Sequence, residues 1–242
     1  MNQLQDISQE DVLNIFCDAS IKTYPDGQVM GCAGAVGFRG GIKQPLVWNY
    51  TLIPPEATNN SSEIVALFLG IQMAHIHRHF FREINVFADS KICVYGIKEW
   101  YISWFNNMNS DGILFSSSGM PVANQEMFKR IIWYMVMNNV RCNIYHQKGH
   151  VTSTIKSLMQ AKKVFEESNG VTLDKKQLSI ICHGNDYVDI KTGDHLERIN
   201  PYKTLGFNFI DSKRSAFVPI VTQEDVIKYT EILKHGGTKD DS

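Results

Sequence analysis

The sequence predicts an α/β fold, with one mixed five-stranded sheet and helices on both of its faces. Two observations predict it. Three strand-like apolar runs, separated by turn signals, fill residues 12–53 and indicate an antiparallel meander. Helical segments then alternate with two further strand-like runs over residues 61–145, which favours parallel strands joined by right-handed crossovers.

The first strand is expected at residues 12–17, an apolar run that ends at Asp18. Turn signals at residues 24–27 and at Gly40 and Gly41 separate it from the next two strands. Capping residues at 58–62 predict the start of a long helix. The other elements expected are strands at 32–38, 46–53, 84–88 and 140–145, helices at 61–79, 90–105 and 124–137, and a polar loop at 106–123.

The order of these elements assigns residues 11–200 to one domain. Residues 151–181 form an insertion in that domain, with a helix at about residues 155–167. Residues 201–242 form a C-terminal extension, with a helical signal at 222–233 and a frayed polar tail at 236–242. The sequence does not indicate what either addition does.

Composition sets the class of protein. A chain of 242 residues with 43% hydrophobic residues can bury a full core, and its net charge of -1 provides no general basic field for nucleic acid. The 5 cysteines lie mostly in apolar runs without metal-ligand spacing, which favours reduced side chains inside a cell. We see neither a signal peptide nor an apolar run long enough to cross a bilayer. A cytoplasmic protein is therefore expected, with no membrane association and no evident protein partner.

Acidic residues stand at positions where a sheet and its helices meet. Asp18 and Asp89 end strands, Glu63 opens a helix, and Asp189 lies in a polar run that begins at Gly184. Carboxylates gathered at one rim of a sheet would repel one another unless they were protonated or bound to cations. Because Mg²⁺ prefers hard oxygen ligands, the pattern predicts two-metal phosphodiester chemistry.

Short motifs around these carboxylates stand in a fixed order between residues 13 and 195. They are Cys17-Asp-Ala-Ser20, Thr58-Asn-Asn-Ser-Ser-Glu63, Ala88-Asp-Ser90, Lys148-Gly-His150 and Gly184-Asn-Asp-Tyr-Val-Asp189. With them the chain resembles type 1 ribonuclease H, the metal-dependent endonuclease that cuts the RNA strand of RNA/DNA hybrids. The resemblance implies a ribonuclease H-like mixed sheet whose first three strands are antiparallel, and cleavage that leaves 5′-phosphate and 3′-hydroxyl ends.

The resemblance also implies a role for each acidic residue. Asp18 would bridge two Mg²⁺ ions, for which Mn²⁺ is a possible substitute. Glu63 and Asp89 would hold the ion on the leaving-group side, and Asp189 would complete the site of the ion that activates the attacking water. His150 matches a mobile loop histidine that assists proton movement or product release.

Recognition of the RNA/DNA hybrid would fall to polar side chains around the same rim. Hydroxyl and amide groups can read the 2′-hydroxyls of an RNA strand across a wide minor groove. The residues at matching positions are Ser20, Asn59, Asn60, Asn124 and Gln125, with Lys91 placed for a phosphate and with Asp186 and His183 as supporting neighbours of the carboxylates.

One part of the chain departs from the family pattern. Residues 106–119 replace a basic, tryptophan-containing loop and contain no Lys or Arg. A weaker grip on the DNA strand follows, unless another segment supplies it. The insertion is the candidate because it carries Lys156, Lys162, Lys163, Lys175 and Lys176. A solvated helix face is the plainer interpretation of these lysines, since acidic residues are mixed with them.

Other interpretations remain open. Any single strand-end aspartate is usually a solvated turn residue, and His150 and His183 taken alone are as readily loop, capping or packing residues. A nuclease of the same fold that acts on DNA, such as a resolvase or an exonuclease, would use the same carboxylates. A noncatalytic nucleic-acid-binding scaffold would have no reason to keep a repulsive acidic cluster.

Overall fold

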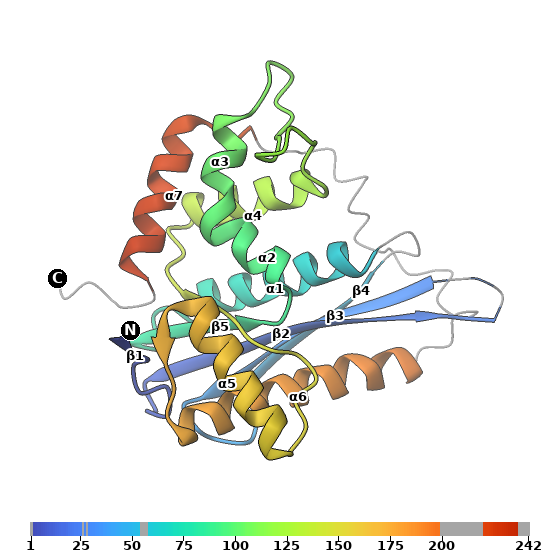
Figure 1. Cartoon of the computed structure of the whole chain (residues 1–242), viewed down its shortest axis with the longest axis vertical. Helices are drawn as coiled ribbons and strands as arrows, with labels where there is room; N and C mark the ends of the chain where they lie inside the picture. Colours follow the sequence, from blue (N-terminus) through green and yellow to red (C-terminus); the bar gives the residue numbers. More distant parts are fainter. Residues whose placement is uncertain (1, 26, 28, 54–57, 199–219, 237–242) are drawn as a thin grey trace.

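The computed structural model describes residues 2–25, 27, 29–53, 58–198 and 220–236 (Figure 1). Much of the predicted C-terminal extension, residues 201–219, and nearly all of its predicted tail, residues 237–242, therefore lie outside the described residues. In the part that is described, no helix has both the length and the apolar character needed to cross a membrane.

The core of the molecule is a mixed sheet with strand order β4-β3-β2-β5-β6. β2 pairs antiparallel with β3, and β3 with β4, whereas β2 and β5 and then β5 and β6 are parallel. The predicted fold class is confirmed. The strands are β2 (Val12–Thr23), β3 (Val29–Arg39), β4 (Val47–Ile53), β5 (Glu83–Ala88) and β6 (Asn143–His146).

Strand pairing brings two of the predicted site residues side by side. Cys17 lies opposite Ala88 in the parallel β2–β5 register, so Asp18 and Asp89 follow on neighbouring strands. The end of the apolar run predicted that β2 would stop at Asp18, but the strand is longer than that. It continues to Thr23 because its outer half pairs with the first residues of β3 and forms a long hairpin. Figure 1 shows this hairpin reaching well beyond the rest of the sheet.

Two layers of helix cover the sheet because its strands are apolar on both faces. Leu13, Ile15 and Cys17 pack in one cluster with α1 (Asn59–His77). Phe16, which points to the other face, packs in a second cluster with residues of α6 (Lys175–Arg198). The two central helices thus approach β2 from opposite sides.

The helix predicted at residues 90–105 is broken into successive segments. α2 (Lys91–Tyr95) leads into a π-helical turn, η1 (Gly96–Trp100), and then into α3 (Tyr101–Asn106). A side chain at Gly96 would overlap the rings of Phe128 and Trp104, so the helix can pack closely there only with glycine. Hydrophobic spacing does not distinguish a π turn from an α turn.

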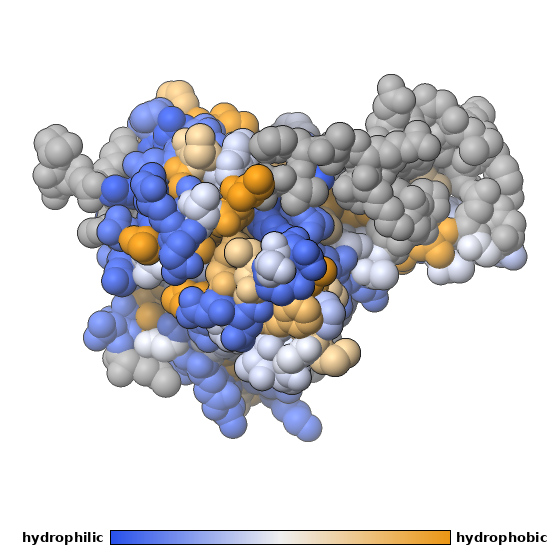
Figure 2. Space-filling view, turned by 90° about the horizontal axis from the view of Figure 1, so that it is seen from above, coloured by the Kyte–Doolittle hydropathy of each residue, from blue (hydrophilic) through white to orange (hydrophobic). Residues whose placement is uncertain are grey.

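Four helices were anticipated in outline by the sequence. α1 begins two residues before its predicted start, behind a capping box in which Thr58 and Ser61 bond each other's backbone N–H groups. The others are α4 (Gln125–Met137), α5 (Ile155–Asn169) and α7 (Gln223–His235), close to their predicted ranges. α7 lies against α3 and α4 (Figure 1). Figure 2 views this end of the molecule, where apolar residues appear in small groups between polar ones.

Two features differ from the sequence-based expectation. The helix that carries Asp189 begins at Lys175, so residues 175–181 of the predicted insertion are the first turns of α6. A small second sheet also forms, in which β1 (Asn2–Gln3) pairs parallel with β7 (Val171–Thr172). Strands of two residues are too short to leave a periodic pattern in the sequence.

Candidate active site

Three of the predicted carboxylates meet at the ends of the central parallel strands. Asp18, Glu63 and Asp89 each offer one oxygen, and these oxygens all lie within 4.8 Å of one another. They come from β2, the second turn of α1 and the residue after β5. The cluster therefore depends on the sheet register and on the position of one helix.

These carboxylates are electrostatically strained. Burial, reinforced by the charges of Asp89 and Asp189, raises the pKa of Asp18 to about 7. Burial and the neighbouring aspartates raise the pKa of Glu63 to about 9. Burial also raises the pKa of Asp89, against the opposing charge of His150. All the ligand atoms that these carboxylates offer are oxygens, and their negative charges are unfavourable in this partly buried site. Hard divalent cations bind oxygen ligands and would compensate the negative charge of the carboxylates.

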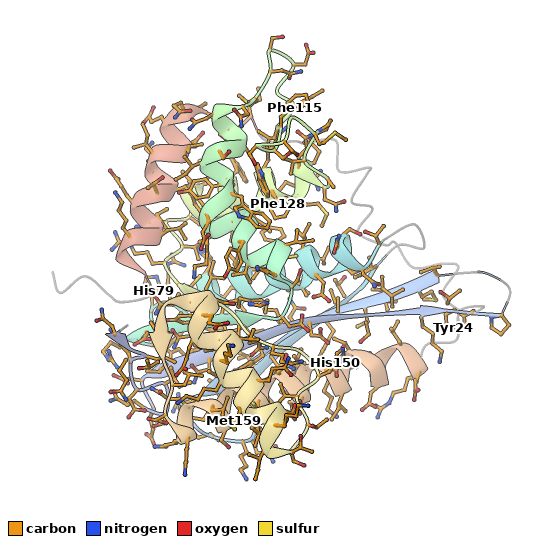
Figure 3. The ribbon with its side chains drawn as sticks, in the orientation of Figure 1. Tyr24, His79, Phe115, Phe128, His150 and Met159 are labelled. Carbon is orange, nitrogen blue, oxygen red and sulfur yellow. The ribbon has the colours of Figure 1, made fainter. Side chains whose placement is uncertain are left out.

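Asp189 lies on α6, which covers the face of the sheet opposite to α1 and Glu63. Its charge acts on Asp18, Glu63 and Asp89, although its oxygens lie outside their compact group. His150 Nδ1 lies 3.3 Å from Asp189 Oδ2, and the His150 side chain is 83% exposed. Figure 3 shows His150 on the loop that leads into α5, beside α6. An exposed imidazole next to a carboxylate can exchange protons with solvent.

Two glycines let the backbone approach the site closely. A Cβ at Gly149 would overlap Asp89 Oδ2, so any larger residue at that position would displace either the loop that carries His150 or the Asp89 carboxylate. A Cβ at Gly184 would overlap the Phe16 ring, which is how α6 comes close enough to the sheet for Asp189 to face the cluster. Both glycines belong to motifs that the sequence analysis singled out.

The structure adds Thr192 and His146, which sequence reasoning missed. Thr192 is fully buried, and its hydroxyl lies 3.4 Å from Asp18 Oδ2 and 2.8 Å from Ser20 Oγ. His146 Nε2 lies 3.1 Å from the Asp89 carbonyl oxygen, while burial lowers the pKa of His146. The one sequence signal that could have indicated Thr192 is its position three residues after Asp189, because residues at that spacing lie on the same face of a helix.

The predicted substrate-binding residues lie on several elements and differ in exposure. Asn59 and Asn60 are exposed in the first turn of α1, and Lys91 is exposed at the start of α2, with its ammonium 5.2 Å from the centroid of the Tyr95 ring. Asn124 precedes α4 in a left-handed conformation, with φ of 55°. Gln125 Oε1 accepts a hydrogen bond from the Leu114 N–H at 2.8 Å, so this side chain also fixes the loop before α4.

Asp186 and His183, the two predicted supporting neighbours, differ in where the structure places them relative to the carboxylates. Asp186 lies on α6, and burial and Asp189 raise its pKa, which places it near the site. His183 is a helical residue, not a loop residue, and its Nε2 lies 3.2 Å from the Lys43 carbonyl oxygen. Its ring packs on Phe38, which lies opposite Asn14, four residues before Asp18 on β2. The structure therefore does not bring His183 to the carboxylates.

A mixed sheet of this order, with carboxylates at the ends of its central strands, defines the ribonuclease H-like class of folds. The family model of RNase H matches residues 10–161. The chain belongs to the RNase H family, which confirms the resemblance seen in the motifs. The matched segment includes Asp18, Glu63, Asp89 and His150 and ends before Asp189. A search of curated proteins gives no match.

Solved structures with a similar fold include several RNase H domains. A foamy viral protease–reverse transcriptase in complex with an RNA/DNA hybrid has a TM-score of 0.47 and 13% identity, over 70% of this chain and 21% of that one. The PFV RNase H domain in solution has a TM-score of 0.44 and 19% identity, over 66% of this chain and 96% of that one. LC9-RNase H1, a type 1 RNase H with the type 2 active-site motif, has a TM-score of 0.41 and 16% identity, over 68% of this chain and 75% of that one.

Proposed function

We propose that this protein is an endoribonuclease that hydrolyses the RNA strand of RNA/DNA hybrids and leaves 5′-phosphate and 3′-hydroxyl ends. The observation that carries the proposal is the group of oxygens from Asp18, Glu63 and Asp89 within 4.8 Å, in a chain of the RNase H family. Membership of the family favours a hybrid over duplex DNA as the substrate. The raised pKa values of Asp18 and Glu63 support a site built to hold cations.

Asp18, Glu63, Asp89 and Asp189 would hold two Mg²⁺ ions, or Mn²⁺ in their place. Bound divalent ions supply an acidified water for attack and neutralise charge on the leaving oxygen. The chain's own residues perform the remaining tasks. Thr192 holds Asp18 in place, His146 holds the backbone at Asp89, and Gly149 lets the His150 loop lie close. His150, exposed on its loop beside Asp189, is placed to carry protons to or from solvent, or to assist product release, during turnover.

Hybrid binding is assigned to the polar residues around this cluster. Asn59, Asn60 and Ser20 present amide and hydroxyl groups that can pair with 2′-hydroxyls of the RNA strand. Lys91 provides an exposed ammonium for a backbone phosphate. Gln125 contributes mainly by holding the loop that precedes Asn124.

A cleavage assay on end-labelled substrates tests this proposal. Purified protein should cut an RNA/DNA hybrid only when Mg²⁺ or Mn²⁺ is present, and only in its RNA strand. Duplex DNA, duplex RNA and branched DNA of the same sequence serve as controls. Equal or faster cutting of either DNA substrate would reject the hybrid as the preferred substrate, and no metal-dependent cutting of any of them would reject the enzyme.

Replacing Gly149 with alanine should reduce hybrid cleavage at least about tenfold with little change in thermal stability. The added Cβ would displace the loop or the Asp89 carboxylate, and a misplacement on the order of 1 Å is costly in catalysis. The matched control is Gly193→Ala on α6, where the added Cβ meets no atom within 4 Å. Unchanged kcat/KM in the Gly149 variant would show that the close approach is not required.

The lysines of the predicted insertion that lie on α5 divide into two groups. Lys162 and Lys163 pair with Glu166 and Glu167 along α5, at 3.4 and 3.7 Å. Lys156 is exposed in the first turn of α5, close in sequence to His150, and within the described residues no carboxylate pairs with it. Lys156 is therefore the better candidate for a phosphate contact.

Lys156→Glu should raise KM for the hybrid about 3- to 10-fold. It should also reduce the slope of log affinity against log salt concentration by about one, which corresponds to one lost phosphate contact. Lys163→Glu, the same charge change two turns further along the helix, should have a smaller effect. Steady-state kinetics and binding measured across salt concentrations provide both values. Identical KM values for the two variants would show that α5 does not contact the substrate.

A further inference from the structure

The C-terminal end of α5 lies against the strand beside Asp89. α5 packs on β6 (Figure 1). β6 is parallel to β5 with His146 opposite Ala88, so the end of β6 lies next to the residue that precedes Asp89. Ser168 and Asn169, the last two residues of α5, make the contacts described below. Both belong to the predicted insertion, whose role the sequence does not indicate.

Asn169 holds the backbone of His146 through both of its polar groups. Asn169 Nδ2 donates to the His146 carbonyl oxygen at 2.7 Å, and Asn169 Oδ1 accepts from the His146 N–H at 3.0 Å. The same Nδ2 group donates to the Phe165 carbonyl oxygen at 2.9 Å, one turn earlier in α5. Because one amide binds two backbone groups of the same residue, His146 cannot shift without breaking both bonds. The end of β6 is therefore fixed by α5.

The side chain of His146 extends this connection to Asp89. His146 Nε2 lies 3.1 Å from the Asp89 carbonyl oxygen, and His146 Nδ1 lies 3.0 Å from Ser168 Oγ. A carbonyl oxygen can only accept, so Nε2 carries the hydrogen. In the neutral ring Nδ1 is then an acceptor, and the Ser168 hydroxyl donates to it. Ser168 thus fixes both the orientation of the ring and the nitrogen that donates to Asp89.

A second connection runs from α5 to the helix that follows Asp89. The Tyr95 hydroxyl donates to the Ser168 carbonyl oxygen at 3.1 Å. Tyr95 is the last residue of α2, which begins two residues after Asp89. The ammonium of Lys91, on the same helix, lies 5.2 Å from the centroid of the Tyr95 ring. The end of α5 is therefore bonded both to the strand beside Asp89 and to the helix after it.

We propose that Ser168 and Asn169 are positioning residues for Asp89, and that through them the insertion sets the affinity of the carboxylate cluster for divalent metal ions. They act through His146, which holds the Asp89 carbonyl oxygen and so keeps the Asp89 carboxylate close to the other two. The inference rests on the proposed function, because it assumes that the cluster holds metal ions. If both residues only ended α5, their loss would lower stability without changing metal affinity.

The first experiment titrates Mn²⁺ into the full chain by calorimetry. Asn169→Ala should weaken Mn²⁺ binding about threefold to tenfold and raise by the same factor the Mg²⁺ concentration that gives half-maximal cleavage. KM for the hybrid at saturating metal should not change. Asn138→Ala is the matched control, because Asn138 at the end of α4 makes the same one-turn bond, from Nδ2 to the Tyr134 carbonyl oxygen at 2.8 Å. It should leave Mn²⁺ binding unchanged.

The second experiment needs neither metal nor substrate. In the metal-free protein, Ser168→Ala should shift the nitrogen resonances of the His146 ring, because Nδ1 loses its donor. The amide resonance of Ser90 should shift as well, since this amide shares a peptide group with the Asp89 carbonyl. Ser168→Thr keeps the hydroxyl and should restore both resonances together with Mn²⁺ affinity. Ser179→Ala, at an exposed position on α6, is the control.

Several results would overturn the inference. Mn²⁺ affinities equal to that of the parent protein in the Ser168→Ala and Asn169→Ala variants would do so and leave the proposed function in place. Equal losses in the Asn169 and Asn138 variants would assign the effect to helix ends in general. Failure of Ser168→Thr to restore affinity would exclude the role of the hydroxyl. A parent protein that binds no Mn²⁺ and cuts no hybrid would reject the proposed function, and the inference with it.

Discussion

Replacing Asp18 with asparagine should lower the rate of hybrid cleavage by about 1,000-fold or more and leave the fold intact. Asp18 is the most buried of the clustered carboxylates, and it lies between Asp89 on the next strand and Thr192 on α6. Asparagine keeps the shape and one oxygen but removes the charge that would hold divalent cations. A loss of about 4 kcal/mol of transition-state stabilisation corresponds to that factor.

Single-turnover cleavage of labelled hybrid measures this effect, with circular dichroism as the check on folding. Asp194→Asn is the matched control, because Asp194 lies on α6 and forms an exposed pair with Lys191 at 3.6 Å. Its activity should stay within about twofold of the parent protein. A purified, folded Asp18 variant that retains metal-dependent cleavage would contradict the assigned site.

Replacing Glu63 with glutamine should stabilise the metal-free protein at neutral pH and abolish its stabilisation by Mg²⁺. The pKa of Glu63 is raised from 4.5 to about 9 in the fold, so between these values the folded state holds a proton that the unfolded state releases. Stability contributed by this group therefore falls as pH rises through that window. At pH 7 the raised pKa of Glu63 lowers the free energy of unfolding by an amount on the order of 3 kcal/mol. Glutamine is neutral and removes this loss of stability.

Chemical unfolding in the presence of a chelator, at pH values from 5 to 9, measures the change. The free energy of unfolding of the parent protein should decline across that range, and that of the Glu63→Gln variant should decline less. At pH 7 the Tm of the variant should lie roughly 5–10 °C higher. Glu167→Gln, on the exposed face of α5, is the control. A variant that is less stable than the parent without metal would refute the electrostatic account.

Much of the fold was predictable from the chain because local signals and global topology agree. The apolar runs, the turn signals and the Thr58 cap indicated the succession of elements along the chain and the start of α1. Asp18 and Asp89 were predictable as neighbours because parallel strands align their carboxyl ends. The motifs around these residues stand in an order that resembles a family pattern, and this resemblance linked the two aspartates to Glu63 and Asp189.

Other features depend on contacts between distant segments, which leave no local pattern. Thr192 is an ordinary helical residue until α6 places it against Asp18. His146 lies one residue beyond the predicted strand at 140–145, and nothing in the sequence indicates that it supports the Asp89 backbone. His183 was misplaced because proximity in sequence to Asp189 does not mean proximity in space on a helix of 24 residues.

Gly184, which lets α6 rest on Phe16, has a consequence for the timing of activity. Glu63 arrives with the helix on one side of the sheet and Asp189 with the helix on the other, late in the chain. A polypeptide still emerging from the ribosome, or a fragment cut before α6, would lack Asp189, one of the four carboxylates proposed to hold the metal ions. Under the proposed function, such a chain would not cut nucleic acid until α6 had packed on the strands.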